Sequence, residues 1–161
     1  MKSTNITRLL DSHKISYTTF ELPTEKLGAL ETARLLNVQP ELVYKTIVFT
    51  REGQGKPILA IVPGTTEVDL KALARAVEEK KLHLPTEREA ERLTGLQVGG
   101  ISPLALINRG FQIVLDASSK THPEIYISGG QRGLNIRLPV KALIDLTRAQ
   151  LTEIAHPTTA S

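Results

Sequence analysis

Two short segments rich in β-branched residues, joined by a glycine-containing turn, constrain the fold of this chain more than any other feature. Residues 46–50 (Thr-Ile-Val-Phe-Thr) and 58–62 (Ile-Leu-Ala-Ile-Val) have the composition of buried strands. The connection contains Glu-Gly-Gln-Gly at 52–55, and glycine is the residue that tight strand connections favour. The sequence therefore predicts an antiparallel hairpin between residues 46 and 62.

Helical periodicity appears outside the hairpin, where apolar residues recur at three- and four-residue spacing. Asp69 is an N-cap candidate for one helix, and Thr86 with Glu89 has the spacing of a capping box for another. The predicted helices are 6–13, 27–37, 70–77 and 87–93, followed by one or two closing helices that contain Val140, Leu143, Ile144, Leu151 and Ile154.

Further strands are predicted where β-branched and aromatic residues lie between polar or glycine-rich turns. They are an edge strand within 15–22 and the segments 111–115, 125–128 and 134–138. Strands and helices do not alternate strictly, which predicts an α+β fold with a mixed, mostly antiparallel, barrel-like sheet. The length of 161 residues fits one compact domain. We expect this domain to span residues 1–155 and residues 156–161 to form a polar tail.

Composition and charge narrow the classes of partner. The chain has 20 basic and 17 acidic residues, a net charge of +3 that weakly favours a polyanionic partner. It lacks the dense Lys/Arg clusters of DNA-binding domains, and 4% aromatic residues argue against a protein that stacks single-stranded bases. No apolar run is long enough to span a bilayer, and no secretion signal or cysteine is present. We therefore expect a cytoplasmic protein that binds neither membranes nor DNA.

Several common catalytic motifs are missing. The four histidines are isolated in sequence, so no metal-binding pair is predicted. The segment 100–104 departs from the serine nucleophile motif G-x-S-x-G because Leu104 replaces the last glycine. Neither the P-loop motif nor the dinucleotide motif G-x-G-x-x-G is present. We expect no metal and no cofactor.

Two glycine clusters and one lysine remain as candidates for a site. The clusters are 98–103 (Val-Gly-Gly-Ile-Ser-Pro) and 129–133 (Gly-Gly-Gln-Arg-Gly). Each is either a tight turn or a place where backbone amides bind an anion or a polarised carbonyl. Lys45 precedes the apolar run of the hairpin, where its ammonium either extends to water or binds a phosphate or carbonyl.

Together these features resemble the YbaK-type aminoacyl-tRNA deacylases, which are related to the editing domain of bacterial prolyl-tRNA synthetases. The resemblance extends from about residue 6 to residue 146, and its motifs are Tyr44-Lys45-Thr46, 98–103 and 125–134 (Ile-Tyr-Ile-Ser-Gly-Gly-Gln-Arg-Gly-Leu). Weaker matches are Val68-Asp69-Leu70-Lys71, 90–95 and Asp116-Ala117.

The resemblance implies a compact α+β fold with helices around the sheet and a cleft for the 3′ aminoacyl end of a mischarged tRNA. The implied reaction cleaves the ester between the terminal ribose and the wrong amino acid, first of all in Cys-tRNA(Pro). In the cysteine branch of the family, the substrate's own thiol attacks the carbonyl and a thiolactone leaves. Prolyl-tRNA synthetase is a candidate protein partner.

The resemblance also assigns roles to individual residues. Lys45 matches the essential lysine, and Gly100 matches the loop that holds the ester carbonyl, so these two are the expected catalytic residues. An activated ester needs mainly positioning and stabilisation of the developing oxyanion, which backbone amides can supply. The expected substrate-binding residues are Phe20, Leu27, Thr46, Ile101, Ser102, Ser128, Gly129 and Asn135.

Two positions differ from the family pattern. The family often has tyrosine where this chain has Phe20, and its cysteine-specific members commonly carry aspartate at the position of Asn135. These differences leave the amino acid open, and a deacylase for alanine or another small amino acid that uses water is the alternative. A catalytically silent module that binds tRNA or a synthetase is the alternative from another class.

Overall fold

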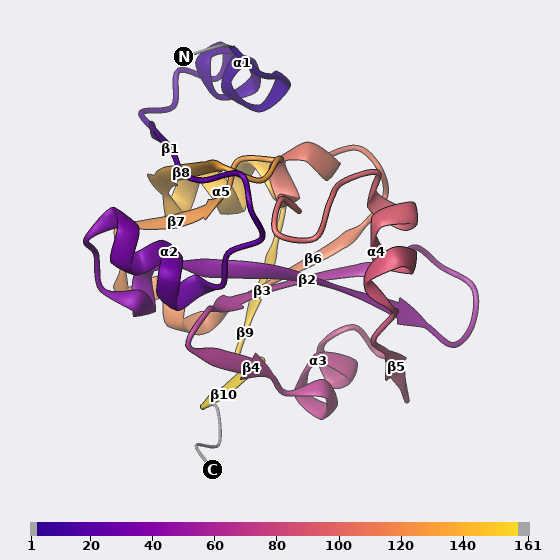
Figure 1. The fold of residues 1–161 in the computed structure, drawn as a ribbon. Coiled ribbons are helices and arrows are strands. Elements are labelled where there is room, and N and C mark those ends of the chain that lie inside the picture. Colours follow the sequence, from indigo (N-terminus) through magenta and orange to yellow (C-terminus); the bar gives the residue numbers. More distant parts are fainter. Residues whose placement is uncertain (1–2, 158–161) are drawn as a thin grey trace.

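The computed structural model describes residues 3–157 and places the predicted hairpin inside a five-stranded sheet of order β5-β2-β3-β6-β9 (Figure 1). Strands β2 (Tyr44–Arg51) and β3 (Ile58–Pro63) pair antiparallel, with Thr46 opposite Ile61. Strand β5 (Leu82–His83) is antiparallel to β2, whereas β6 (Gln112–Asp116) and β9 (Gln150–Thr152) are parallel to their neighbours. The sheet is mixed, as predicted, but it is open rather than a closed barrel.

A second, antiparallel sheet covers one face of the first. Its order is β1-β8-β7, with β1 (Thr18–Glu21) at the predicted edge, β8 (Leu134–Pro139) in the middle and β7 (Glu124–Ser128) on the other side. A single parallel bridge between Val43 and Tyr126 connects this sheet to the residue before β2. The contact brings the ends of β7 and β8 close to the beginning of β2.

The predicted helices form with local shifts at their ends: α1 (Asn5–Ser12), α2 (Ala29–Leu36), α3 (Leu70–Ala76), α4 (Glu87–Thr94) and α5 (Val140–Thr147). Asp69 caps α3, because its Oδ1 accepts from the amide of Ala72 at 3.0 Å. Thr86 caps α4 in the same way, but the capping box is incomplete, since the Glu89 carboxylate pairs with Arg92 instead.

The prediction of a helix over Leu151 and Ile154 is wrong. These residues belong to β9 and to the connection to β10 (Ala155–Pro157), which pairs with β4 (Thr66–Val68). Arg148 ends α5 with a φ of 57°, and the open edge of β6 then offers a parallel partner. The predicted tail boundary stays a prediction; β10 continues through Pro157, and residues 158–161 lie outside the described residues.

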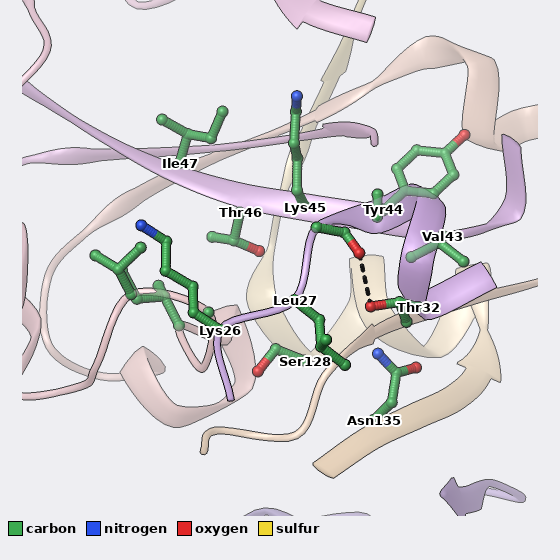
Figure 2. A pocket seen from close by; sticks show the side chains of 15 residues that line it. Lys26, Leu27, Thr32, Val43, Tyr44, Lys45, Thr46, Ile47, Ser128 and Asn135 are labelled. Atoms are coloured by element: carbon green, nitrogen blue, oxygen red, sulfur yellow. Dashed lines mark hydrogen bonds between the residues drawn. The ribbon is translucent and has the colours of Figure 1, made fainter. Parts of the chain in front are cut away.

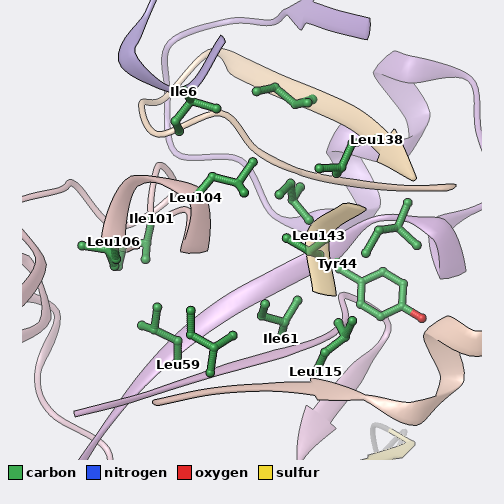
Figure 3. Close-up of a cluster of buried hydrophobic side chains, with 14 of the residues drawn as sticks. Ile6, Tyr44, Leu59, Ile61, Ile101, Leu104, Leu106, Leu115, Leu138 and Leu143 are labelled. Atoms are coloured by element: carbon green, nitrogen blue, oxygen red, sulfur yellow. The ribbon is translucent and has the colours of Figure 1, made fainter. Parts of the chain in front are cut away.

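Strand β3 lies at the centre of the core and is buried on both faces. Leu59 and Ile61 face the three-stranded sheet and α5, as Figure 3 shows. Ala60 and Val62 face the opposite way and pack against Leu73 of α3. Two-sided burial explains why residues 58–62 form an unbroken apolar run rather than an alternating one. Within residues 3–157, no helix has the length and apolarity needed to cross a membrane.

Candidate active site at the start of strand β2

A pocket of about 260 Å³ opens where β2 begins (Figure 2). Its walls come from five places: the loop before α2, α2 itself, the start of β2, the loop at 98–101, and the facing ends of β7 and β8. The lining residues are Lys26, Leu27, Gly28, Ala29, Thr32, Val43, Tyr44, Lys45, Thr46, Ile47, Val98, Gly99, Ile101, Ser128 and Asn135. The pocket therefore brings together four parts of the sequence: residues 26–32, residues 43–47, residues 98–101, and the facing ends of β7 and β8.

Most of the residues predicted to form a site meet in this pocket. Those that line it are Leu27, Lys45, Thr46, Ile101, Ser128 and Asn135. Ser128 and Asn135 are direct neighbours across the β7–β8 ladder. Their roles in binding a substrate stay predictions.

Lys45 and Thr46 leave β2 on opposite faces, because side chains alternate along a strand. Figure 2 shows the Lys45 side chain extending away from Ser128 and Asn135. The pKa of Lys45 is lowered because partial burial disfavours the charged form, an effect that nearby Glu67 partly opposes. In the described part of the chain, no carboxylate forms an ion pair with Lys45. Its ammonium therefore lies on the other side of β2 from Thr46, Ser128 and Asn135, without an ion-pair partner among residues 3–157.

Asn135 supplies an unusual polar group to the pocket wall. Its side chain is 7% exposed, and its Oδ1 has no hydrogen-bond partner within residues 3–157. A buried polar atom left without a partner costs about 1–3 kcal/mol. Because the carboxamide has both a donor and an acceptor end, it can offer either one to a ligand by rotating. Asn135 is the strongest structural indication that a polar ligand belongs here.

The two glycine clusters pack against each other rather than acting as separate turns. A Cβ atom built on Gly100 would lie 2.8 Å from the backbone of Gln131 and of Arg132. The Arg132 guanidinium in turn donates from Nε to the Val98 carbonyl at 2.7 Å. Gly100 is therefore required for close approach of two loops, and not for a positive φ.

This geometry corrects the expected action of the Gly100 amide. That amide donates to the Gln97 carbonyl at 2.8 Å, and Gly100 does not line the pocket. An amide bound inside its own loop is not available to polarise an ester carbonyl. Its neighbour Gly99 lines the pocket with a φ of 95°, a conformation that glycine adopts most readily.

Three more predicted substrate-binding residues lie outside the pocket lining. Ser102 is fully buried and caps the short 3₁₀ helix at Pro103–Leu106 by accepting from the amide of Leu104. Gly129 makes room for Leu134, and Phe20 packs on the ring of Tyr126 with centroids 5.7 Å apart. The roles of these residues in substrate binding stay predictions.

Sequence reasoning missed Lys26 as a wall residue of the pocket. Lys26 forms an ion pair of 2.5 Å with Glu87, which connects the loop before α2 to the first turn of α4. Thr32 was also missed, because it belongs to no motif. Its hydroxyl donates to the Gly28 carbonyl, and the residue lines the pocket. Neither residue carries a sequence signal beyond its proximity to Leu27.

The pocket combines the buried carboxamide of Asn135 with a lysine that has no ion-pair partner among residues 3–157, and a family comparison identifies the class of protein. Residues 25–146 match the family model of the aminoacyl-tRNA editing domain. The chain belongs to this family. It is 32% identical over 155 residues to a protein of Enterococcus faecalis that is described provisionally as the Cys-tRNA(Pro)/Cys-tRNA(Cys) deacylase EbsC. That similarity covers 95% of this chain and 93% of the relative.

Solved structures agree with the family assignment. One, described provisionally as a trans-editing enzyme for prolyl-tRNA synthetase, is 26% identical with a TM-score of 0.80, and the match covers 97% of this chain and 99% of the other. Another, the hypothetical protein APE2540, has a TM-score of 0.86 at 19% identity over 95% of this chain and 100% of the other. The second likeness concerns the fold alone.

Proposed function

We propose that this protein is a trans-acting deacylase that cleaves the aminoacyl ester of mischarged tRNA, with Cys-tRNA(Pro) as the first candidate substrate. The observation that carries the proposal is a pocket lined by both Lys45 and Asn135, in which the Asn135 Oδ1 has no hydrogen-bond partner within residues 3–157. Family membership and the name of the E. faecalis relative support it. We place the reaction in the cytoplasm, with prolyl-tRNA synthetase as the candidate partner.

The arrangement suits a reaction in which the protein mainly positions the ester. Lys45 borders the pocket and can hold a phosphate of the RNA by a charge-assisted hydrogen bond. Inside, Thr46, Ser128 and Asn135 offer hydroxyl and amide groups to the aminoacyl moiety. Holding a reactive ester in one geometry lowers the barrier even without a protein nucleophile.

Two routes of bond cleavage fit this pocket. With cysteine, the substrate thiol attacks the carbonyl, the C–S bond forms, the ester C–O bond breaks, and the thiol proton ends on the ribose oxygen. With alanine or another small amino acid, water attacks and the free amino acid leaves. Asn135 is the observation that keeps the second route open, because a neutral carboxamide replaces the carboxylate common in cysteine-specific relatives.

A panel of charged tRNAs tests the proposal. We expect loss of the amino acid from Cys-tRNA(Pro) at a rate well above the buffer rate, and retention of proline on Pro-tRNA(Pro). Trapping the product distinguishes thiolactone from free cysteine and so identifies the route. If no charged tRNA in the panel is deacylated faster than in buffer, with or without prolyl-tRNA synthetase, the proposal is wrong and the silent binding module takes its place.

A further inference from the structure

Strand β2 has an open stretch along one edge. At its start, the second sheet touches the strand through the bridge between Val43 and Tyr126. Near its end, β5 pairs with it, with Thr50 opposite His83. Between these two contacts no strand of the described chain pairs with β2 on that side.

The register identifies which backbone groups face the open side. The amide of Gly64 donates to the carbonyl of Val43 at 2.7 Å, so these two residues form a hydrogen-bonded pair of the β2–β3 ladder. Hydrogen-bonded and non-hydrogen-bonded pairs alternate along an antiparallel ladder. Residues 45, 47 and 49 therefore turn their amides and carbonyls toward β3, whereas Thr46 and Val48 turn theirs toward the open edge.

An apolar groove of about 220 Å³ runs along the same edge. Leu84, Pro85, Ala90 and Val98 are among its wall residues, and α4 borders it. It shares Thr46, Ile47, Val98 and Ile101 with the pocket described above, so the two cavities form one continuous depression. The groove is smaller than sites for drug-sized ligands, which suits a single planar ring system.

We propose that this groove binds the adenine of the 3′-terminal nucleotide of tRNA. The carbonyl of Thr46 accepts a hydrogen bond from the N6 amino group, and the amide of Val48 donates to the neighbouring ring nitrogen. The inference rests on the proposed function, because it places the base next to the ester that the first pocket holds. Adenine presents an amino donor beside a ring acceptor, whereas guanine presents O6 and N7 as two acceptors.

An added strand from another protein is the other chemistry that an open edge can serve. Here only Thr46 and Val48 face outward between the bridge and β5, which is short of the five or six residues of an ordinary strand. The apolar walls also suit the two faces of a ring. The base is therefore the occupant that the geometry favours.

Titration with nucleotides tests the base site independently of deacylation. In amide-resolved NMR spectra of the whole protein, we expect adenosine 5′-monophosphate to shift the amides of Thr46, Ile47 and Val48 and the methyl signals of Leu84 and Ala90. Inosine 5′-monophosphate, which has an oxygen in place of the amino group, should shift them far less. Equal shifts with both nucleotides, or no shifts with either, overturn the inference. If the shifts instead depend on protein concentration and are accompanied by slower tumbling, the edge pairs with a strand of a second copy of the chain. This result also overturns the inference.

A kinetic experiment uses the substrate itself. Acceptor-stem microhelices charged with cysteine and ending in CCA or in CC-inosine are compared, and we expect a ratio of kcat/KM of about tenfold or more in favour of CCA. Leu84→Gln should raise KM severalfold for CCA only, whereas the matched control Leu70→Gln on α3 should leave it unchanged. Equal rates on CCA and CC-inosine overturn the base site while the deacylase function stands. Absence of any deacylation instead refutes the function, and the nucleotide titration still decides the site.

Discussion

Strands β2 and β3 are partners in one hairpin, yet only β2 lines the candidate site. Strand β3 lies between β2 and β6, and all of its residues are buried. Strand β2 has a neighbour on both sides only near Thr50, so its first half exposes a polar edge beside Lys45 and Thr46. The difference teaches that a strand with a missing neighbour and polar residues keeps groups free for a ligand, whereas an apolar strand paired on both sides does not.

The largest expected effect is a loss of stability when a buried residue of β3 is replaced. Ile61→Ala on β3 removes a fully buried side chain and should lower the free energy of unfolding by about 2–5 kcal/mol. Denaturant unfolding measures this, and deacylation per folded molecule should change little. An Ile61→Ala variant that keeps its stability but loses activity would contradict the assignment of β3 to the core and of β2 to the site.

Lys45→Ala on β2 should have the opposite profile. Losing a charged hydrogen-bond donor to the substrate lowers kcat/KM by about tenfold to a hundredfold, whereas the melting temperature stays the same. Lys71→Ala, at an exposed position of α3, is the matched control. Near-normal turnover of Lys45→Ala on its best charged tRNA contradicts the assigned role.

Gly100→Ala tests whether the loop contact supports the pocket. The added methyl group meets the backbone of Gln131 and Arg132, and overpacking of this kind costs about 1–3 kcal/mol of stability. We expect activity per folded molecule to fall as well, because the neighbouring Gly99 and Ile101 line the pocket. Melting curves and single-turnover deacylation on one preparation separate the two effects. Full activity in a destabilised protein would show that the loop contact does not shape the site.

Asn135→Leu should raise stability and lower deacylation activity. It removes a buried polar atom without a partner, so we expect a gain of about 1 kcal/mol in the free energy of unfolding. Deacylation should fall at the same time, since the pocket loses its carboxamide. If the variant is less stable than the parent protein, the carboxamide has a partner that the described structure does not contain.

The smallest effect concerns pH. The lowered pKa of Lys45 means that its positive charge is lost, as pH rises, at a lower pH than for an ordinary lysine. Binding of an uncharged acceptor-stem microhelix should therefore weaken through that window. Lys45→Arg should retain binding to higher pH, because the guanidinium stays protonated. Identical pH profiles for lysine and arginine, measured by fluorescence anisotropy, would exclude the ammonium as the titrating group.

The parts of the fold predicted well from sequence are those with local causes. The hairpin follows from strand composition and turn glycines, and the start of α3 follows from the Asp69 cap. The prediction of a helix around Leu151 was wrong because two apolar residues are too few to establish a helical period. The open edge of β6 decides between them, and that edge exists only after the sheet has formed.

The candidate site also has features that the sequence predicted and features that it did not. The resemblance to the family marks the positions of Lys45, Ser128 and Asn135, and all three residues line the pocket. The motifs do not indicate that the Gly100 amide is bound to Gln97. Composition and motif spacing do not specify which turn a glycine-rich loop adopts.

The contact of Gly100 with Gln131 and Arg132 also bears on how the protein folds and opens. It joins two loops that are separated in sequence, so it depends on the sheets that hold both loops in place. Partial opening that separates these loops would dismantle the pocket while β3 stays protected. Hydrogen exchange should accordingly be faster at the Gly100 amide than at the amides of Leu59 and Ile61. Loss of activity would then precede global unfolding on heating.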